Sequence, residues 1–233
     1  MLVEDRDSSD ASGLSLCGPL FYAVTGVVAL GLAAASIPVD ATLSSWMRNW
    51  DIPGDLAKLI NFSEVFAHGL GVSAILGAIW WLSNNRSLVG VAILITATSG
   101  IVSNGMKALF VRVRPHSVPL VSVESALTSA DELAETRVDQ EGRELVAPSF
   151  WDARQRSFPS GHSATAVGLA IGLTLIWRQG WWIFAIYALL ASLQRLTSGA
   201  HFPSDVLAGW CIALGCAACY LALPPIRRIV QSS

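Results

Sequence analysis

Six long apolar segments, separated by connectors of unequal length, constrain this chain more than any other feature of its sequence. Each has roughly the twenty residues that an α-helix needs to cross a bilayer. Backbone in contact with lipid must satisfy its own hydrogen bonds, and runs this long and apolar do so as helices rather than as barrel strands. The sequence therefore predicts an all-α integral membrane protein, a bundle of six transmembrane helices over residues 19–37, 63–82, 88–109, 160–177, 181–196 and 203–223.

The composition agrees with a membrane protein of one domain. Charged residues make up 14% of the chain, whereas an average soluble domain carries about 25%. The net charge is −2 and no basic tract is present, so we expect no nucleic-acid partner. Three of the four cysteines share one apolar run that holds no His, Asp or Glu. They are expected to be packing residues rather than metal ligands.

The remaining segments are assigned by their charge and position. We expect residues 1–18 to be a cytoplasmic N-terminal segment, 19–223 the membrane domain and 224–233 a cytoplasmic C-terminal tail. The residues before the first span are acidic, which argues against a cleaved signal peptide. The long connector, 110–159, is expected on the outer side. Its acidic middle is interpreted as a solvated loop that includes a possible short helix at 131–135, with a lid over a site as the alternative.

Aromatic residues mark the two ends of the predicted bundle. Residues 42–50 place Leu43, Trp46, Met47 and Trp50 on one helical face, which predicts a short helix lying in the membrane interface. At the other end, tight connectors bring several tryptophans to one predicted membrane face, as in an interfacial aromatic belt. These are Trp80, Trp81, Trp177, Trp181 and Trp182.

Three polar clusters lie where the spans reach the opposite face. Taken alone, a lysine at the end of a span usually extends to the headgroups, and Pro-Ser-Gly is an ordinary helix start. An arginine inside a span is harder to explain, because placing it in a bilayer costs about 2.5–3.5 kcal/mol. The clusters are Lys107 with Arg114-Pro115, then Pro159-Ser160-Gly161-His162, then Arg195 with His201 and Asp205.

Together these clusters predict a site for a phosphoryl group. Lys107, Arg114 and Arg195 would repel one another in an empty site, and a bound phosphate would relieve that repulsion. The helix start at Ser160 and Gly161 offers backbone N–H groups to the same anion. No ligand set for a divalent metal is visible, so no cofactor is expected.

Two histidines add reactive groups to this site. Asp205 follows His201 in the first turn of a predicted helix, and its carboxylate can hold one ring nitrogen. The other ring nitrogen would then be free to attack phosphorus. His162, on a different helix, can protonate the leaving oxygen.

The clusters, in this order and spacing, resemble the signature of the type 2 phosphatidic acid phosphatase superfamily. The family pattern is K-x6-R-P, P-S-G-H and S-R-x5-H-x3-D; the first two are complete here, and Gln194 replaces the serine of the third. The resemblance implies metal-independent catalysis through a phosphohistidine, at a site on the periplasmic or extracellular side of the cell membrane. It also implies the roles of eight residues: Lys107, Arg114, Ser160, Gly161 and Arg195 hold the phosphate, His201 is the nucleophile, Asp205 its partner and His162 the acid.

Several alternatives stay open at this level. The leading prediction is a phosphohydrolase acting on a lipid phosphate or lipid diphosphate, and a phosphotransferase would use the same intermediate. A non-catalytic binder or transporter of anionic lipid would need the cations but neither histidine. Glu64 and His68, one helical turn apart, are interpreted as a polar pair packed inside the bundle, with a substrate contact as the alternative. Neither the lipid nor the oligomeric state is specified.

Overall fold

The computed structural model describes residues 18–110, 112–117 and 156–232. Within these ranges every regular element is a helix, and the one β-type contact is an isolated bridge between Arg112 and Arg156. The prediction of an all-α protein is confirmed for this part of the chain. The expectations for the N-terminal segment and for the acidic part of the long connector fall on residues outside it.

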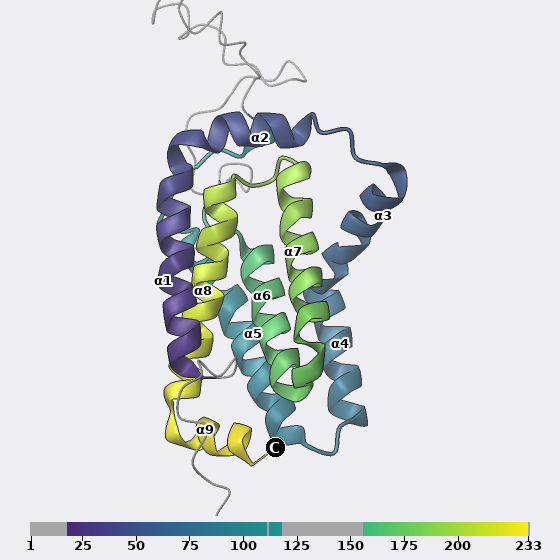
Figure 1. The fold of residues 1–233 in the computed structure, drawn as a ribbon, viewed down its shortest axis with the longest axis vertical. Coiled ribbons are helices and arrows are strands. Elements are labelled where there is room, and N and C mark those ends of the chain that lie inside the picture. The colour runs from purple at the N-terminus through teal and green to yellow at the C-terminus, as the bar shows by residue number, and fades with distance from the viewer. Residues whose placement is uncertain (1–17, 111, 118–155, 233) are drawn as a thin grey trace, which may run out of the picture.

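The helices form an upright bundle closed at each end by a crossing helix. In Figure 1, α1, α5, α6, α7 and α8 run side by side along the long axis, while α2 crosses one end and α9 the other. The central helix is α6, which packs against α5, α7 and α8. The bounds are α1 Pro19–Ser36, α2 Asp40–Arg48, α3 Gly54–Phe62, α4 Gly69–Leu82, α5 Arg86–Met106, α6 Gly161–Ile176, α7 Trp181–Thr197, α8 Pro203–Ala222 and α9 Pro224–Gln231.

The length and hydropathy of the helices are those of a membrane protein. In the described ranges, three helical stretches are long and apolar enough to cross a bilayer: Pro19–Arg48, Arg86–Met106 and Pro203–Ala222. A fourth candidate is the pair Gly54–Phe66 and Gly69–Leu82, which is bent by 68°. Helices α6 and α7 are shorter, at 16 and 17 residues. The count of six spans therefore stays a prediction.

The predicted second helix, 63–82, is not continuous. A short 3₁₀ turn, Ser63–Phe66, ends before Ala67, and α4 begins at Gly69. The chain folds closely on itself here: a Cβ on Gly71 would lie 2.2 Å from the Val65 carbonyl oxygen, so only glycine fits. Ala67, His68 and Gly69, at this break, line a pocket between the helices.

Close packing of α8 against the start of α6 brings two of the polar clusters together. Gly209 on α8 faces the carbonyl oxygen of Ser160, and a Cβ there would lie 2.5 Å from that oxygen. In the same region Ser160 N–H donates to the carbonyl oxygen of Asp205 at 2.9 Å. The N-terminal ends of α6 and α8 are therefore held side by side.

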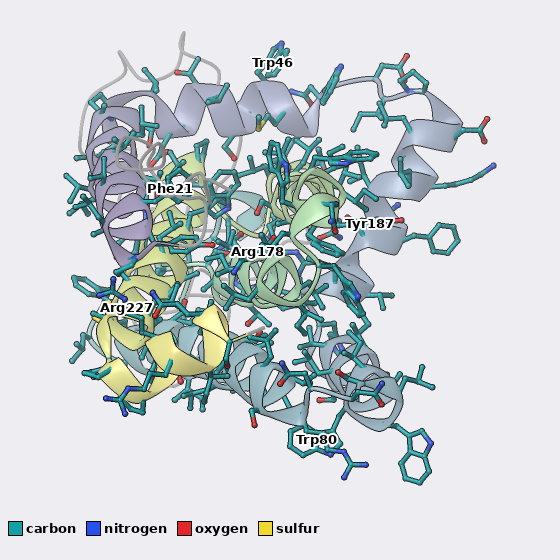
Figure 2. The ribbon with its side chains drawn as sticks, turned by 60° about the horizontal axis from the view of Figure 1, so that its bottom comes forward. Phe21, Trp46, Trp80, Arg178, Tyr187 and Arg227 are labelled. Atoms are coloured by element: carbon teal, nitrogen blue, oxygen red, sulfur yellow. The ribbon has the colours of Figure 1, made fainter. Side chains whose placement is uncertain are left out.

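The two ends of the bundle match the predicted aromatic pattern. The five tryptophans of the predicted belt are all exposed or half-buried at the end where α4 and α6 finish and α7 begins. Figure 2 turns this end forward and shows Trp80, Arg178 and Arg227 there, with Trp46 on α2 at the far end. Residues 224–233, predicted as a tail, hold α9, whose Val230 is buried against the core.

Candidate active site

A pocket of about 290 Å³ lies beside the N-terminus of α6 and collects most of the predicted site. It is bordered by the end of α5, the start of α6, the end of α7 and the break before α4. Ser160 and Asp205 do not line it: Ser160 directly precedes Gly161, which does, and Asp205 faces the side chain of His201, which does. Six of the eight predicted residues line it: Lys107, Arg114, Gly161, His162, Arg195 and His201.

The start of α6 is built by Ser160. Its backbone is extended, and its Oγ accepts from Ser163 N–H at 3.4 Å, as expected for the residue that caps a helix N-terminus. Gly161 follows as the first helical residue and His162 points into the pocket from the same turn. The N-terminal end of α6, which favours negative charge, therefore faces the pocket.

His201 and Asp205 face each other behind the pocket. Nδ1 of His201 lies 3.6 Å from Oδ2 of Asp205, and both side chains are buried. This separation is longer than a hydrogen bond, but it turns Nδ1 toward the carboxylate and leaves Nε2 on the opposite edge of the ring. Burial lowers the pKa of His201, and the Asp205 carboxylate opposes this only in part. The imidazole is therefore neutral near pH 7, the form with a free lone pair.

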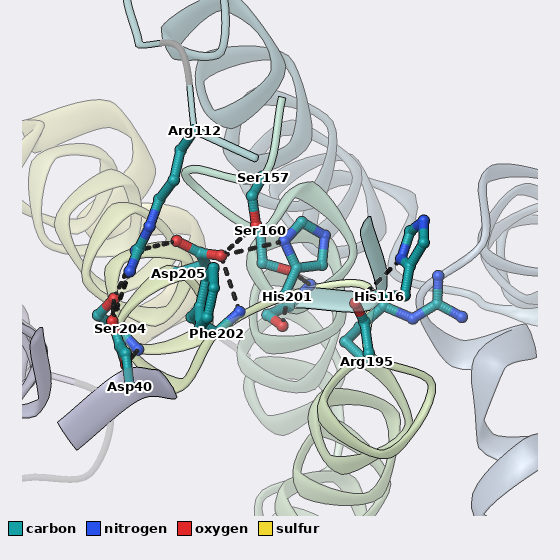
Figure 3. Close-up of polar contacts among 12 residues, drawn as sticks. Asp40, Arg112, His116, Ser157, Ser160, Arg195, His201, Phe202, Ser204 and Asp205 are labelled. Atoms are coloured by element: carbon teal, nitrogen blue, oxygen red, sulfur yellow. Dashed lines mark hydrogen bonds and ion pairs between the residues drawn. The ribbon is translucent and has the colours of Figure 1, made fainter. Parts of the chain in front are cut away.

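The Asp205 carboxylate has three further partners. Oδ2 accepts from Phe202 N–H at 2.8 Å, which closes the first turn of α8, and also from Ser157 Oγ. Oδ1 accepts from Nη1 of Arg112 at 2.5 Å (Figure 3). Asp205 is thus held on both oxygens.

The sequence did not predict the ion pair between Arg112 and Asp40. Nη2 of Arg112 lies 2.6 Å from Oδ2 of Asp40, a buried residue at the start of α2. Asp40 also accepts from Ser204 N–H at 3.0 Å. The only sequence signals were an acidic residue directly after an apolar run and a second arginine in Arg112-Val113-Arg114-Pro115. Neither identifies its partner.

Arg195 is held from two sides. Its Nη2 lies 2.6 Å from Oε1 of Glu64, and its Nε donates to Oε1 of Gln194. Gln194, the departure from the family pattern, is buried and orients the guanidinium. Its role as a support for Arg195 was not readable from the sequence.

The interpretation of Glu64 and His68 as one polar pair is wrong. Glu64 pairs with Arg195, while His68, directly before α4, is exposed and lines the pocket. The ring centroid of His68 lies 6.2 Å from that of His162. The backbone keeps the helical hydrogen bond from His68 N–H to the Glu64 carbonyl oxygen, at 2.8 Å, so the error concerns the partners of the two side chains: no local pattern shows Arg195 beside Glu64.

The positive charges converge as the sequence predicted. Burial, and then the nearby Arg114 guanidinium, lower the pKa of Lys107 to about 8. The lowered pKa shows that the charged form of Lys107 is unfavourable beside the other cations, and a bound anion would stabilise it. The described residues hold no group of three His, Cys, Asp or Glu side chains placed to bind a metal.

The comparisons with known proteins agree with this fold. The pattern of the PAP2 superfamily matches residues 88–228, so the chain belongs to this superfamily. Its fold is similar to that of the PAP2-type phosphatidylglycerolphosphate phosphatase from Bacillus subtilis, with a TM-score of 0.57 and 20% identity over 92% of this chain and 96% of that one. It is also similar to LpxE from Aquifex aeolicus, with a TM-score of 0.55 and 20% identity over 77% of this chain and 92% of that one.

Curated relatives match over shorter stretches. The chain is 37% identical to an undecaprenyl-diphosphatase from Sulfolobus acidocaldarius over 81 residues, which are 32% of this chain and 38% of that protein. It is 41% identical to a lipid A 4'-phosphatase from Bacteroides thetaiotaomicron over 54 residues, 22% of this chain and 24% of that protein. The chain therefore matches well under half the length of these relatives.

Proposed function

We propose that this protein is a lipid phosphate phosphatase that hydrolyses a lipid phosphate or lipid diphosphate through a phosphohistidine. One observation carries this proposal: three cations and the two predicted histidines, His162 and His201, come from separate segments and line one pocket. A binder of anionic lipid would need the cations, but would have no use for a buried imidazole backed by a carboxylate 3.6 Å away.

In the first half of the reaction, Nε2 of His201 attacks phosphorus. The bond between phosphorus and the leaving oxygen breaks, and His162 donates a proton to that oxygen. Asp205 stabilises the positive charge that develops on His201. The product is a phosphohistidine and a released lipid alcohol or lipid phosphate.

In the second half, water replaces the leaving group. His162 accepts a proton from the water as its oxygen attacks phosphorus, and the bond between phosphorus and His201 breaks. Inorganic phosphate leaves, and His201 returns to its neutral form. Each side chain ends as it began, so no cofactor is consumed.

The phosphoryl oxygens are held through both halves by Lys107, Arg114 and Arg195, together with the start of α6 at Ser160 and Gly161. Groups of this kind act on charge that builds up in the transition state, and removal of one typically costs about 10²–10³-fold in rate. Glu64 and Gln194 fix the plane of the Arg195 guanidinium before the substrate arrives. His68 remains available for a contact with the substrate headgroup.

We further infer that the chain crosses the cell membrane six times, with the site on the periplasmic or extracellular side. In support of this count, the shorter α6 and α7 lie alongside the longer helices in Figure 1. The break before α4 and the ends of α5 and α7 bring the pocket toward the bundle end that α2 crosses.

The experiment is phosphate release by the purified protein in detergent, measured on a panel of lipid monophosphates and diphosphates without added metal. We expect turnover by the wild-type protein and none by His201→Ala. Transfer of phosphate to an acceptor alcohol, with little free phosphate, would indicate a phosphotransferase. Undiminished phosphate release by His201→Ala would contradict the proposal.

A further inference from the structure

Arg112 is fixed between two buried carboxylates and occupies a variable position of the first sequence cluster, between Lys107 and Arg114. One guanidinium nitrogen donates to Asp205 at 2.5 Å and the other to Asp40 at 2.6 Å. The carbon of the guanidinium group also lies 4.4 Å from the centre of the Phe202 ring. A planar fork held on two carboxylates and one ring has a single orientation.

The main chain of Arg112 reaches the same carboxylate by a second route. Its carbonyl oxygen accepts from Ser157 N–H at 2.9 Å, and Ser157 Oγ donates to Oδ2 of Asp205. Arg112 therefore contacts one carboxylate oxygen directly and controls a donor to the other, while Asp205 faces His201 (Figure 3).

From this geometry we propose that Arg112, held in place by Asp40, is a positioning residue that sets the orientation and effective charge of Asp205 and, through it, the reactivity of His201. This inference rests on the proposed function. Arg112 and Asp40 do not line the pocket, so neither contacts the phosphoryl group there. Both act through Asp205.

The charges predict opposite effects for the two residues. The positive charge of Arg112 offsets the negative charge of Asp205. Loss of the Arg112 charge therefore leaves a stronger negative field and makes His201 easier to protonate. Asp40 offsets Arg112 in turn, so its loss makes His201 harder to protonate. The other charged or titratable groups that line the pocket around His201 are Lys107, Arg114, Arg195, His162 and His68, and none of them is changed in this comparison.

The test is the pH dependence of kcat/KM for one lipid phosphate, measured in detergent with Arg112→Gln, Arg112→Lys and Asp40→Asn. The rate rises with pH as His201 loses its proton, which gives the acid limb of the profile. We expect Arg112→Gln to move this limb to higher pH by on the order of 1 unit. Asp40→Asn should move it to lower pH, and Arg112→Lys should leave it in place while lowering kcat, because a lysine lacks the fork.

A structural role alone would lower activity in all three variants and leave the acid limb where it is, and that result would overturn the inference. Asp40→Asn can still accept from Ser204, so it decides the question even where Arg112→Gln does not fold. Arg227→Gln, on exposed α9 at the far end of the bundle, is the matched control and should leave the profile unchanged. Phosphate release by His201→Ala would instead contradict the proposed function itself.

Discussion

Nδ1 of His201 lies 3.6 Å from Oδ2 of Asp205, at the point where the connector after α7 enters α8. The hydrogen bonds that close the first turn of α8 also aim the carboxylate, because Oδ2 accepts from Phe202 N–H. The Asp205 side chain therefore both caps α8 and orients the His201 ring.

His162 should matter more for one class of substrate than for another. The leaving group of a lipid monophosphate is an alkoxide, which needs a proton. The leaving group of a lipid diphosphate is a lipid phosphate, which is stable as an anion. His162→Asn should therefore lower kcat on the monophosphate by about 10²–10⁴-fold and on the diphosphate by much less. Matched substrates with the same tail test this. An equal loss on both would argue against His162 as the proton donor.

Alkaline pH should weaken the enzyme through Lys107. Burial and the nearby Arg114 place its pKa at about 8, so the amine is charged below this pH and neutral above it. Because the charged form holds phosphate, kcat/KM, which reports the free enzyme, should fall above about pH 8. Lys107→Arg keeps its charge and should extend the plateau upward. The exposed control Lys58→Arg should not, and an unmoved limb in Lys107→Arg would count against this assignment.

Packing between α6 and α8 should be needed for both stability and activity. A Cβ on Gly209 would lie 2.5 Å from the Ser160 carbonyl oxygen, so Gly209→Ala should cost about 1–3 kcal/mol of folding free energy. It should also lower kcat, because it separates the helix that carries His162 from the one that carries Asp205. Gly215→Ala, on the same helix with open space around it, is the control. Thermal unfolding in detergent and turnover measure the two effects, and equal behaviour of the two variants would refute the packing argument.

The sequence predicted six of the residues that line the pocket, because their spacing follows from helix ends. A lysine that ends one span and histidines that begin or precede others must meet if those ends share a membrane face. That reasoning needs only the lengths of the apolar runs. It placed Lys107, His162 and His201 correctly around one pocket without any knowledge of packing.

The rest depended on contacts between distant segments. The hydropathy of 63–82 shows neither the break before α4 nor the partners of its two polar residues, Arg195 for Glu64 and the pocket for His68. Arg112 and Arg114 are two residues apart, and the course of the backbone decides that Arg114 lines the pocket while Arg112 turns to Asp205. No local pattern carries that information.

Removal of divalent metal should leave the reaction intact. The proposed groups supply the nucleophile, the proton donor and the positive charge from side chains and the start of α6, so no step needs a metal. We expect full turnover in excess chelator, measured as phosphate release. A loss that magnesium restores would require a different mechanism.

The central claim is that phosphate becomes bonded to His201 during turnover, and trapping that adduct tests it most directly. His162→Asn, mixed with a lipid diphosphate radiolabelled in its terminal phosphate and quenched in alkali, should accumulate label, because the leaving group departs without help while attack by water is slowed. Peptide mapping should place the label on His201, and His162→Asn/His201→Ala should carry none. Label on another residue, or none during continued turnover, would contradict the account.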